Sequence, residues 1–399
     1  MRRLFLLVIA ATSLTLQSQT LQHEQARRQA ATFLNAVRNN PTTITPDQLK
    51  LAGESEGCCL FNATSGGWAI TKGKGDEVRV LAYNDSGNLD GEQLPGSIQA
   101  WLKAYSEQDM VKGEVIYTDE RIEIAPMLRT HWGQDAPYNN LCPLVPGEDG
   151  ETMVHAAAGC ANVAVAQLMN YHQWPRSCDE VTYKWLGYPG VEPQDHGTLP
   201  ATVFNWDAMN EDNDNGWSEV AKLLQYIGYA NSTIYGWKAS TTYAQRIINT
   251  LTAFGYDAVQ TGFDIYNNEP FLDDAIYQEL RTRRPVLLSV YAIENDDSHI
   301  CVVDGYSKDG FYHINWGWKG HGDGYFVLPT SHVATEDFST RFSVQTMISA
   351  KIKDDYAAVS VTHLNKTIDN TFFDMQGRRL NGQPRHGLYI RDGRKYVVR

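Results

Sequence analysis

Cysteine is scarce in this chain, and its spacing excludes two common uses of the thiol. Six cysteines in 399 residues are too few for a disulfide scaffold. No C-x-x-C pair occurs, so a zinc site is not expected. Cys58 and Cys59 are adjacent and cannot easily bond to each other, whereas Cys142 and Cys178 could bridge two loops. We expect neither a metal nor another cofactor.

Basic residues are in the minority. The chain has 34 Lys and Arg against 47 Asp and Glu, a formal net charge of −13 at pH 7. Proteins that bind nucleic acids carry basic surfaces, because they must neutralise phosphates. The acidic balance therefore argues against a nucleic-acid partner. With 42% hydrophobic and 20% charged residues, the chain has the composition of a globular protein.

Long apolar runs are absent. The run from Leu4 to Leu16 is shorter than the roughly 20 residues that span a bilayer. Arg2 and Arg3 precede this run and small polar residues follow it, which is typical of a secretory signal peptide. We predict a signal peptide over residues 1–18, no membrane span, and a protein that is secreted or displayed on the surface of a bacterial cell.

The stretch from Ala157 to His172 is small or apolar nearly all round, which predicts a buried helix. Gly159 allows a sharp turn at its entry and Pro175 closes it. Cys160 would lie in the first turn, where unpaired backbone N–H groups and the helix dipole favour the thiolate. The simpler alternative is that Cys160 is a small apolar residue packed in a core helix.

Two predicted strands downstream carry the residues that such a thiolate requires. His299 opens an apolar run, and Asn315 lies on the strand that follows the turn at Asp309-Gly310. His299 follows Cys160 by about 140 residues, within the separation of roughly 130 to 150 found in papain-type peptidases. Nucleophile, base and orienting residue occur in papain in this order. We therefore predict that Cys160 and His299 form a thiolate–imidazolium pair.

Four motifs together resemble the streptopain family of secreted bacterial cysteine peptidases. They are Gly159-Cys160, the segment from Ala166 to Pro175, His299 to Gly305, and His313 to Trp318. The resemblance implies an α+β, papain-like cysteine peptidase fold with a helical subdomain and an antiparallel β subdomain. It also implies protein and peptide substrates with an apolar residue two positions before the cut bond.

The resemblance assigns roles to three further residues. Gln134 matches the glutamine whose amide binds the developing oxyanion beside the backbone N–H of Cys160. The amide oxygen of Asn315 could accept the imidazole N–H of His299 and set its tautomer, with Trp316 shielding that bond. The third catalytic position stays open between Asn315 and Trp316.

Three other histidines are alternative bases, but the spacing to Cys160 favours His299. They are His155, His172 and His313. Cys301 alternates into the interior of the strand that His299 opens, so we expect it to be unreactive.

The N-terminal part of the chain, residues 19–112, is predicted to be a small α+β domain. Its Gly66 to Ile70 and Leu81 to Gly87 segments look like the streptopain propeptide. That resemblance implies an inhibitory prodomain that covers the active site until it is cleaved. The elements expected in this domain are helices at 22–39 and 95–105 and strands at 59–62, 68–71 and 78–83.

A linker with the maturation bond is predicted over 113–121, and the catalytic domain over 122–352. Besides the helix of Cys160, we expect helices at 217–227, 241–254 and 273–284. A buried strand is expected at 286–291, and further strands are expected from His299, from Phe311 and near 325–328.

Residues 353–399 form a separate tail of short strands and turns. It resembles the C-terminal sorting tails of proteins exported by type IX secretion; the alternative is a small β appendage that packs on the body.

The whole resemblance implies a secreted cysteine endopeptidase made as a zymogen, with its own prodomain as inhibitor. Two alternatives remain: a non-catalytic surface binding protein on a peptidase scaffold, and an acyltransferase that uses the same pair.

Overall fold

The computed structural model describes residues 2–38, 42–106, 121–262, 271–292, 297–328 and 342–353, and four strands between 372 and 398. The chain divides into two compact units, Met1–Lys351 and Ile352–Arg399. Most of the predicted linker lies outside the described residues. No helix among the described residues combines the length and the apolar character needed to cross a membrane. The signal peptide stays a prediction.

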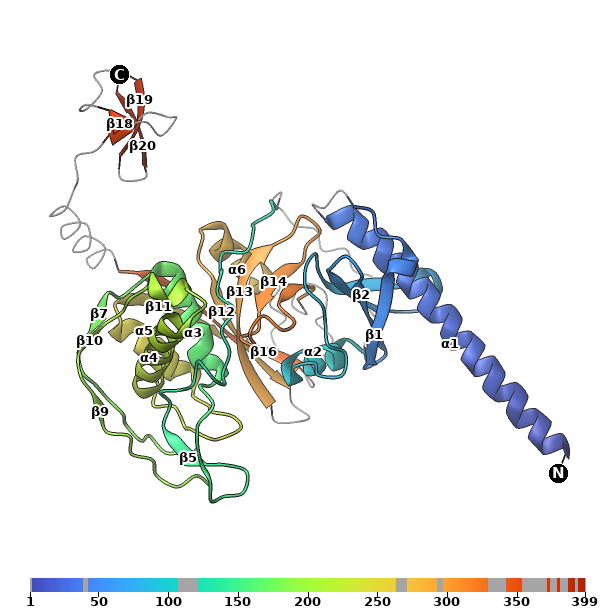
Figure 1. Ribbon diagram of the computed structural model, residues 1–399, viewed down its shortest axis with the longest axis horizontal. Coiled ribbons are helices and arrows are strands. Elements are labelled where there is room, and N and C mark those ends of the chain that lie inside the picture. Colours follow the sequence, from blue (N-terminus) through green and yellow to red (C-terminus); the bar gives the residue numbers. More distant parts are fainter. Residues whose placement is uncertain are drawn as a thin grey trace. The chain divides into compact units, whose positions relative to one another are not determined.

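In the described part of the first unit there are six α-helices and one large sheet (Figure 1). The helices are α1 (Arg2–Val37), α2 (Gly96–Ser106), α3 (Cys160–His172), α4 (Asp214–Ala230), α5 (Ala244–Ala253) and α6 (Phe271–Arg281). The predicted helices are all present, and five of them end within a few residues of the expected positions. Helix α1 differs, because it begins at Arg2 and not near residue 22.

The sheet has ten strands in the order β1-β2-β3-β4-β15-β14-β13-β12-β16-β11. Their bounds are β1 (Leu49–Ser55), β2 (Cys58–Ala63), β3 (Trp68–Lys72), β4 (Arg79–Asn84), β11 (Tyr256–Gly262), β12 (Val286–Ala292), β13 (Asp297–Tyr306), β14 (Tyr312–Asn315), β15 (Gly324–Phe326) and β16 (Phe342–Ile352). Strands β1, β11 and β16 were not predicted from the sequence. Short two-stranded pairs join β5 (Leu144–Pro146) to β6 (Met153–His155), β7 (Ser177–Cys178) to β10 (Thr202–Val203), and β8 (Val181–Thr182) to β9 (Thr198–Leu199).

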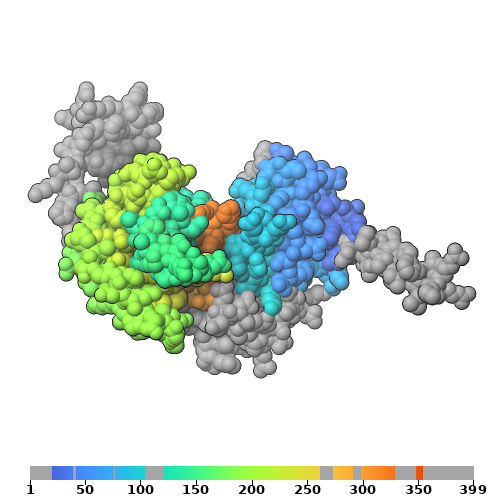
Figure 2. All heavy atoms as spheres, turned by 60° about the horizontal axis from the view of Figure 1, so that its bottom comes forward, coloured from blue at the N-terminus to red at the C-terminus, as the bar shows by residue number. Residues whose placement is uncertain are grey.

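The N-terminal strands and the catalytic strands belong to one sheet. β4 pairs antiparallel with β15, and Tyr83 stacks on Tyr325 with 5.1 Å between the ring centroids. Figure 2 shows the blue N-terminal residues packed directly against orange residues of the catalytic part. The N-terminal part, which we predict to be a prodomain, therefore extends the sheet of the later strands and is not a separately packed cap.

The alternation of side chains along β2 explains how one strand serves two cores. Cys58 and Leu60 face a core cluster that they share with the catalytic strands, while Cys59 and Phe61 face a second cluster under α1. Because both faces are covered, β2 is apolar at nearly every position. All six cysteines are free thiols, so the bridge considered between Cys142 and Cys178 does not form.

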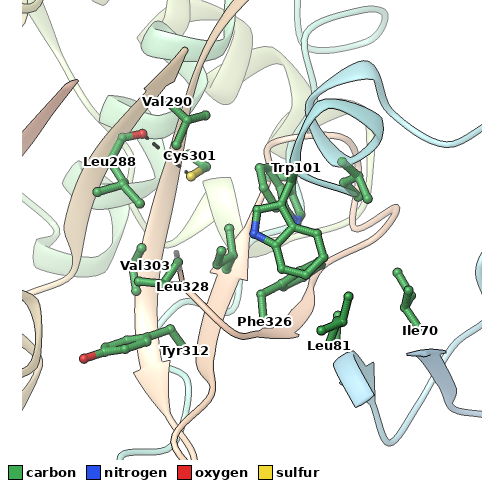
Figure 3. Packing of buried hydrophobic residues seen from close by; sticks show 14 of the residues in the cluster. Ile70, Leu81, Trp101, Leu288, Val290, Cys301, Val303, Tyr312, Phe326 and Leu328 are labelled. Carbon is green, nitrogen blue, oxygen red and sulfur yellow. Dashed lines mark hydrogen bonds between the residues drawn. The ribbon is translucent and has the colours of Figure 1, made fainter. Parts of the chain in front are cut away.

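Helix α2 packs on strands β13, β14 and β15 through the shared core cluster. The Trp101 ring meets Phe326 edge-on, with 5.0 Å between the ring centroids (Figure 3). Phe326 in turn meets the ring of Trp316 edge-on. Cys301 and Val303 of β13 lie in the same cluster. Apolar burial of this kind is the main stabilising contribution to a folded domain.

The second unit is a four-stranded sheet in the order β18-β17-β19-β20. Its strands are β17 (Phe372–Phe373), β18 (Arg379–Leu380), β19 (Gly387–Arg391) and β20 (Arg394–Val398). The short strands expected in the tail are present, and its role in sorting stays a prediction.

Candidate active site

Cys160 begins α3, and the chain reaches it through a conformation that only glycine adopts easily. Gly159 has φ +90°, and a Cβ built on it would lie 3.1 Å from the carbonyl oxygen of Ser240. Every residue of α3 from Ala161 to Asn170 is buried, as its apolar sequence predicts. Cys160 itself is partly exposed at the positive end of this buried helix.

His299 lies on β13 and faces Cys160. Burial of the Cys160 thiol opposes its ionisation, but the His299 imidazole and its hydrogen bond outweigh this effect. Backbone hydrogen bonds from Ile300 and Ala161 add to the stabilisation of the thiolate. The net result is that the pKa of Cys160 lies below its ordinary value. This pair has the electrostatics of an activated nucleophile.

The orientation of His299 comes from backbone and aromatic groups. Its Nε2 is 2.8 Å from the carbonyl oxygen of Trp316. Trp318 stacks on the imidazole with 5.7 Å between centroids and 12° between planes, and Trp316 lies tilted at 6.0 Å. Because the carbonyl oxygen can only accept, Nε2 carries the proton in this arrangement, which leaves Nδ1 for the thiol.

Asn315 contributes differently from the prediction. Its Oδ1 accepts hydrogen bonds from Gln167 Nε2 at 2.9 Å and from the backbone N of Gly317 at 3.0 Å. Its Nδ2 donates to the carbonyl oxygen of Thr130. Both lone pairs of Oδ1 are thus engaged. The amide oxygen of Asn315, which we considered as an acceptor for His299, is thus engaged elsewhere, and Nε2 of His299 lies beside the carbonyl oxygen of Trp316.

The hydrogen bond from Gly317 links Asn315 to His299 through one peptide unit. The N–H of Gly317 and the C=O of Trp316 belong to the same planar group and point in opposite directions. Asn315 holds the N–H side of this unit, and His299 bonds to its C=O side. Asn315 therefore positions the imidazole of His299 indirectly, through this peptide unit.

Gln134 lies beside the segment that leads into α3. Its carbonyl oxygen accepts a hydrogen bond from the backbone N of Ala158 at 2.7 Å, and the residue is 8% exposed. This backbone contact brings Gln134 next to the turn at Gly159.

The three alternative bases have other partners. His155 Nδ1 is 2.7 Å from the carbonyl oxygen of Cys142, and His313 Nδ1 is 2.6 Å from Asp304 Oδ1. Burial lowers the pKa of His172 to about 4, and its ring packs edge-on against Tyr171 and Tyr256. Burial also raises the pKa of Cys301 far above its ordinary value, as expected of an unreactive thiol.

Three residues around the pair were not singled out from the sequence. Trp318 ends the motif from His313 to Trp318, and nothing in that motif indicates that its indole stacks on His299. Gln167 is fully buried on α3, the helix of Cys160, and its Oε1 accepts from Thr130 Oγ1 at 2.9 Å. Asp323 Oδ1 accepts from the backbone N of Trp316 at 2.8 Å.

The prodomain packs on the loop that carries Asp323. The side-chain amide of Asn84 donates to the carbonyl oxygen of Asp323 at 2.8 Å. Side chains at Gly322 and Gly324 would collide with the prodomain residues Ile98 and Trp68. The glycines of this loop are thus required for the close approach of the two parts.

A cavity of about 900 Å³ lies along the C-terminal half of α3, and its lining includes Gln167, Asn170 and Trp217. Cys160 and His299 do not line it. Among the described residues, no cluster of His, Cys, Asp and Glu side chains is arranged to hold a metal ion.

Comparisons with known proteins show which family the chain is similar to. The sequence model of the Peptidase C10 family matches residues 132–326, and that of the Spi protease inhibitor matches residues 18–109. Streptopain of Streptococcus pyogenes is 27% identical over 346 residues, which cover 78% of this chain and 86% of streptopain. The thiol protease/hemagglutinin PrtT of Porphyromonas gingivalis is 24% identical over 78% of this chain and 38% of its own length. The fold matches a prointerpain A fragment from Prevotella intermedia with a TM-score of 0.57 and 24% identity, over 76% of this chain and 98% of that fragment.

Proposed function

This chain belongs to the Peptidase C10 family of streptopain-like cysteine peptidases and carries an inhibitory propeptide, and on this premise we propose that Cys160 and His299 are its catalytic pair. The thiolate of Cys160 attacks a peptide carbonyl and forms a tetrahedral intermediate. His299 then protonates the leaving amine, and water hydrolyses the thioester while His299 takes its proton.

The oxyanion of the intermediate lies between the backbone N–H of Cys160 and the side-chain amide of Gln134. The first donor is supported by the position of Cys160 at the start of α3, where N–H groups are unpaired. The second is supported by the backbone contact of Gln134 with Ala158. Trp316 acts through its carbonyl oxygen on His299, and Asn315 acts through the peptide unit that carries this oxygen.

One observation carries the proposal: the imidazole of His299 faces the thiol of Cys160 and lowers its pKa. The physiological reaction would then be the hydrolysis of peptide bonds in proteins, as an endopeptidase. Maturation would cut the chain between the prodomain and the catalytic domain, within or near 113–121. The signal peptide and the C-terminal unit would direct export, the latter by type IX secretion.

The test compares the wild-type chain with Cys160→Ala. We expect the wild type to convert itself to a shorter form and to hydrolyse casein, and the variant to stay full-length and inactive. N-terminal sequencing and mass of both forms locate the maturation bond. Casein hydrolysis that survives in Cys160→Ala would overturn the assignment of the nucleophile. Transfer of the acyl group to added amines in preference to water would favour the acyltransferase instead.

The localisation is tested separately. We expect the wild-type protein in the medium or on the cell surface, and a chain that lacks residues 353–399 to be retained. Export that is unchanged without these residues would overturn the sorting role of the tail and leave the peptidase assignment intact.

A further inference from the structure

Trp316 supplies the carbonyl oxygen that orients His299, and both peptide units that flank it are held by buried side chains. Asn315 Oδ1 holds the N–H of Gly317, in the unit that follows Trp316. Asp323 Oδ1 holds the N–H of Trp316, in the unit that precedes it, at 2.8 Å. Because each peptide unit is planar, fixing the units before and after Trp316 also fixes the backbone dihedral angles at its Cα. The carbonyl oxygen of Trp316 then points in one direction.

The carboxylate of Asp323 is itself held in place. Its Oδ2 lies 3.2 Å from Nδ1 of His131, its side chain is 4% exposed, and its backbone N donates to the carbonyl oxygen of Gly320. A buried carboxylate is costly unless it is paired and hydrogen-bonded, and this one has a partner on each oxygen.

We propose that Asp323 is a positioning residue for the Cys160–His299 pair: its carboxylate fixes the backbone at Trp316, and this fixes the carbonyl oxygen that bonds to Nε2 of His299. The inference rests on the proposed peptidase function. Asp323 touches neither the thiol nor the substrate in this role. It acts through two hydrogen bonds. The first joins the Asp323 carboxylate to the backbone N–H of Trp316, and the second joins the carbonyl oxygen of Trp316 to Nε2 of His299.

The alternative is that Asp323 only stabilises the turn between β14 and β15. Both roles predict a loss of stability when the carboxylate is removed, because the N–H of Trp316 would be left buried without a partner. They differ in what happens to Cys160. A positioning role also predicts a weaker thiolate–imidazolium pair. The rate at which iodoacetamide alkylates Cys160 measures this directly, because the thiolate is the form that reacts.

Asp304 provides the matched control. It is a second buried carboxylate on this sheet, it accepts from the backbone N of Met127 and of Leu128, and it pairs with His313. These contacts resemble those of Asp323 in kind but do not lead to Trp316. Asp304→Ala should therefore cost stability without changing the reactivity of Cys160.

The experiment measures the rate of Cys160 alkylation by iodoacetamide against pH in the full-length chain, by peptide mass, together with urea unfolding. In Asp323→Ala the rate at pH 6 should fall about 10- to 100-fold, the range expected when one buried hydrogen bond is lost. Asp323→Asn keeps an acceptor oxygen for Trp316 and should stay within about fivefold of the wild type, since the carbonyl of an amide accepts as a carboxylate does.

If Asp323→Ala does not fold, Asp323→Ser replaces it in the experiment, because the shorter serine side chain also removes the hydrogen bond to the Trp316 N–H. A folded Asp323→Ala or Asp323→Ser chain with the wild-type alkylation profile would overturn the proposal. So would an equal loss of Cys160 reactivity in Asp304→Ala. Casein hydrolysis by the wild type is measured in parallel: its absence would refute the peptidase function, whereas its presence with an unchanged Asp323→Ala profile would refute only this inference.

Discussion

The indole of Trp318 stacks on the imidazole of His299, with 5.7 Å between the ring centroids and 12° between the ring planes. A tryptophan face attracts a cation, and this attraction is stronger for a buried pair than for an exposed one. His299 is 6% exposed, so the stack contributes in a site from which water is largely excluded. The imidazolium is the form that the stack favours.

Replacing Trp318 with alanine should therefore weaken the thiolate–imidazolium pair. A cation–π contact of about 0.5–2 kcal/mol corresponds to a loss of roughly 2- to 30-fold in the alkylation rate of Cys160 at pH 6. Trp318→Phe keeps an aromatic face and should lose less. If Trp318→Ala and Trp318→Phe react at equal rates, the ring face has no electrostatic role.

The oxyanion role of Gln134 predicts a loss that is specific to acyl transfer. Gln134→Ala should lower kcat for peptide hydrolysis by about 100- to 1,000-fold, the cost of removing one oxyanion donor. Alkylation of Cys160 by iodoacetamide develops no oxyanion, so its rate should stay close to that of the wild type. A parallel fall in both rates would show that Gln134 acts on the thiol and not on the intermediate.

The reactive pair could be predicted from the sequence because each partner has a local signal. Cys160 sits between a glycine and an apolar run of helical character, and His299 opens an apolar strand. The acceptor of the imidazole N–H could not be predicted in the same way. Every residue has a backbone carbonyl, so the residue type gives no sign that the oxygen of Trp316 takes this place instead of the amide of Asn315.

Contacts between distant segments were the other part that the sequence did not reveal. The pairing of β4 with β15 joins strands more than two hundred residues apart, and no local pattern specifies it. Strands β1, β11 and β16 also escaped prediction, because in β1 exposed and partly buried residues follow one another without clear alternation. Trp318 was missed for a related reason: its partner lies on another strand.

Gly159 should tolerate no side chain. Gly159→Ala places an L-residue at φ +90°, at a cost of about 1–2 kcal/mol, and also crowds the carbonyl oxygen of Ser240. Gly150 has φ +73° and open space around its Cα, so Gly150→Ala carries the backbone cost without the crowding. Urea unfolding in the Cys160→Ala background, which prevents self-cleavage, should show the larger loss for Gly159→Ala. Equal losses would mean that the contact with Ser240 relaxes freely.

His172 should make the fold sensitive to acid. Burial lowers its pKa to about 4, below the ordinary value of 6.5, so the unfolded chain binds a proton in this interval that the folded chain does not. The contribution of neutral His172 is therefore complete above pH 6.5 and is lost as the pH falls towards 4. His172→Phe keeps a ring against Tyr256, and its stability relative to the wild type should rise as the pH is lowered. A difference that does not change between pH 7 and pH 4.5 would contradict this.

The most direct test of the account is the pH dependence of Cys160 alkylation by iodoacetamide in the full-length wild type and in His299→Gln. The wild-type thiol should stay reactive well below its ordinary pKa, because the imidazolium of His299 stabilises the thiolate. In His299→Gln, burial raises the pKa of Cys160 without an imidazolium to oppose it. The midpoint of the alkylation rate against pH should therefore move to higher pH, and the reactivity at pH 6 should disappear. Identical profiles for the two chains would show that Cys160 and His299 do not form a working pair.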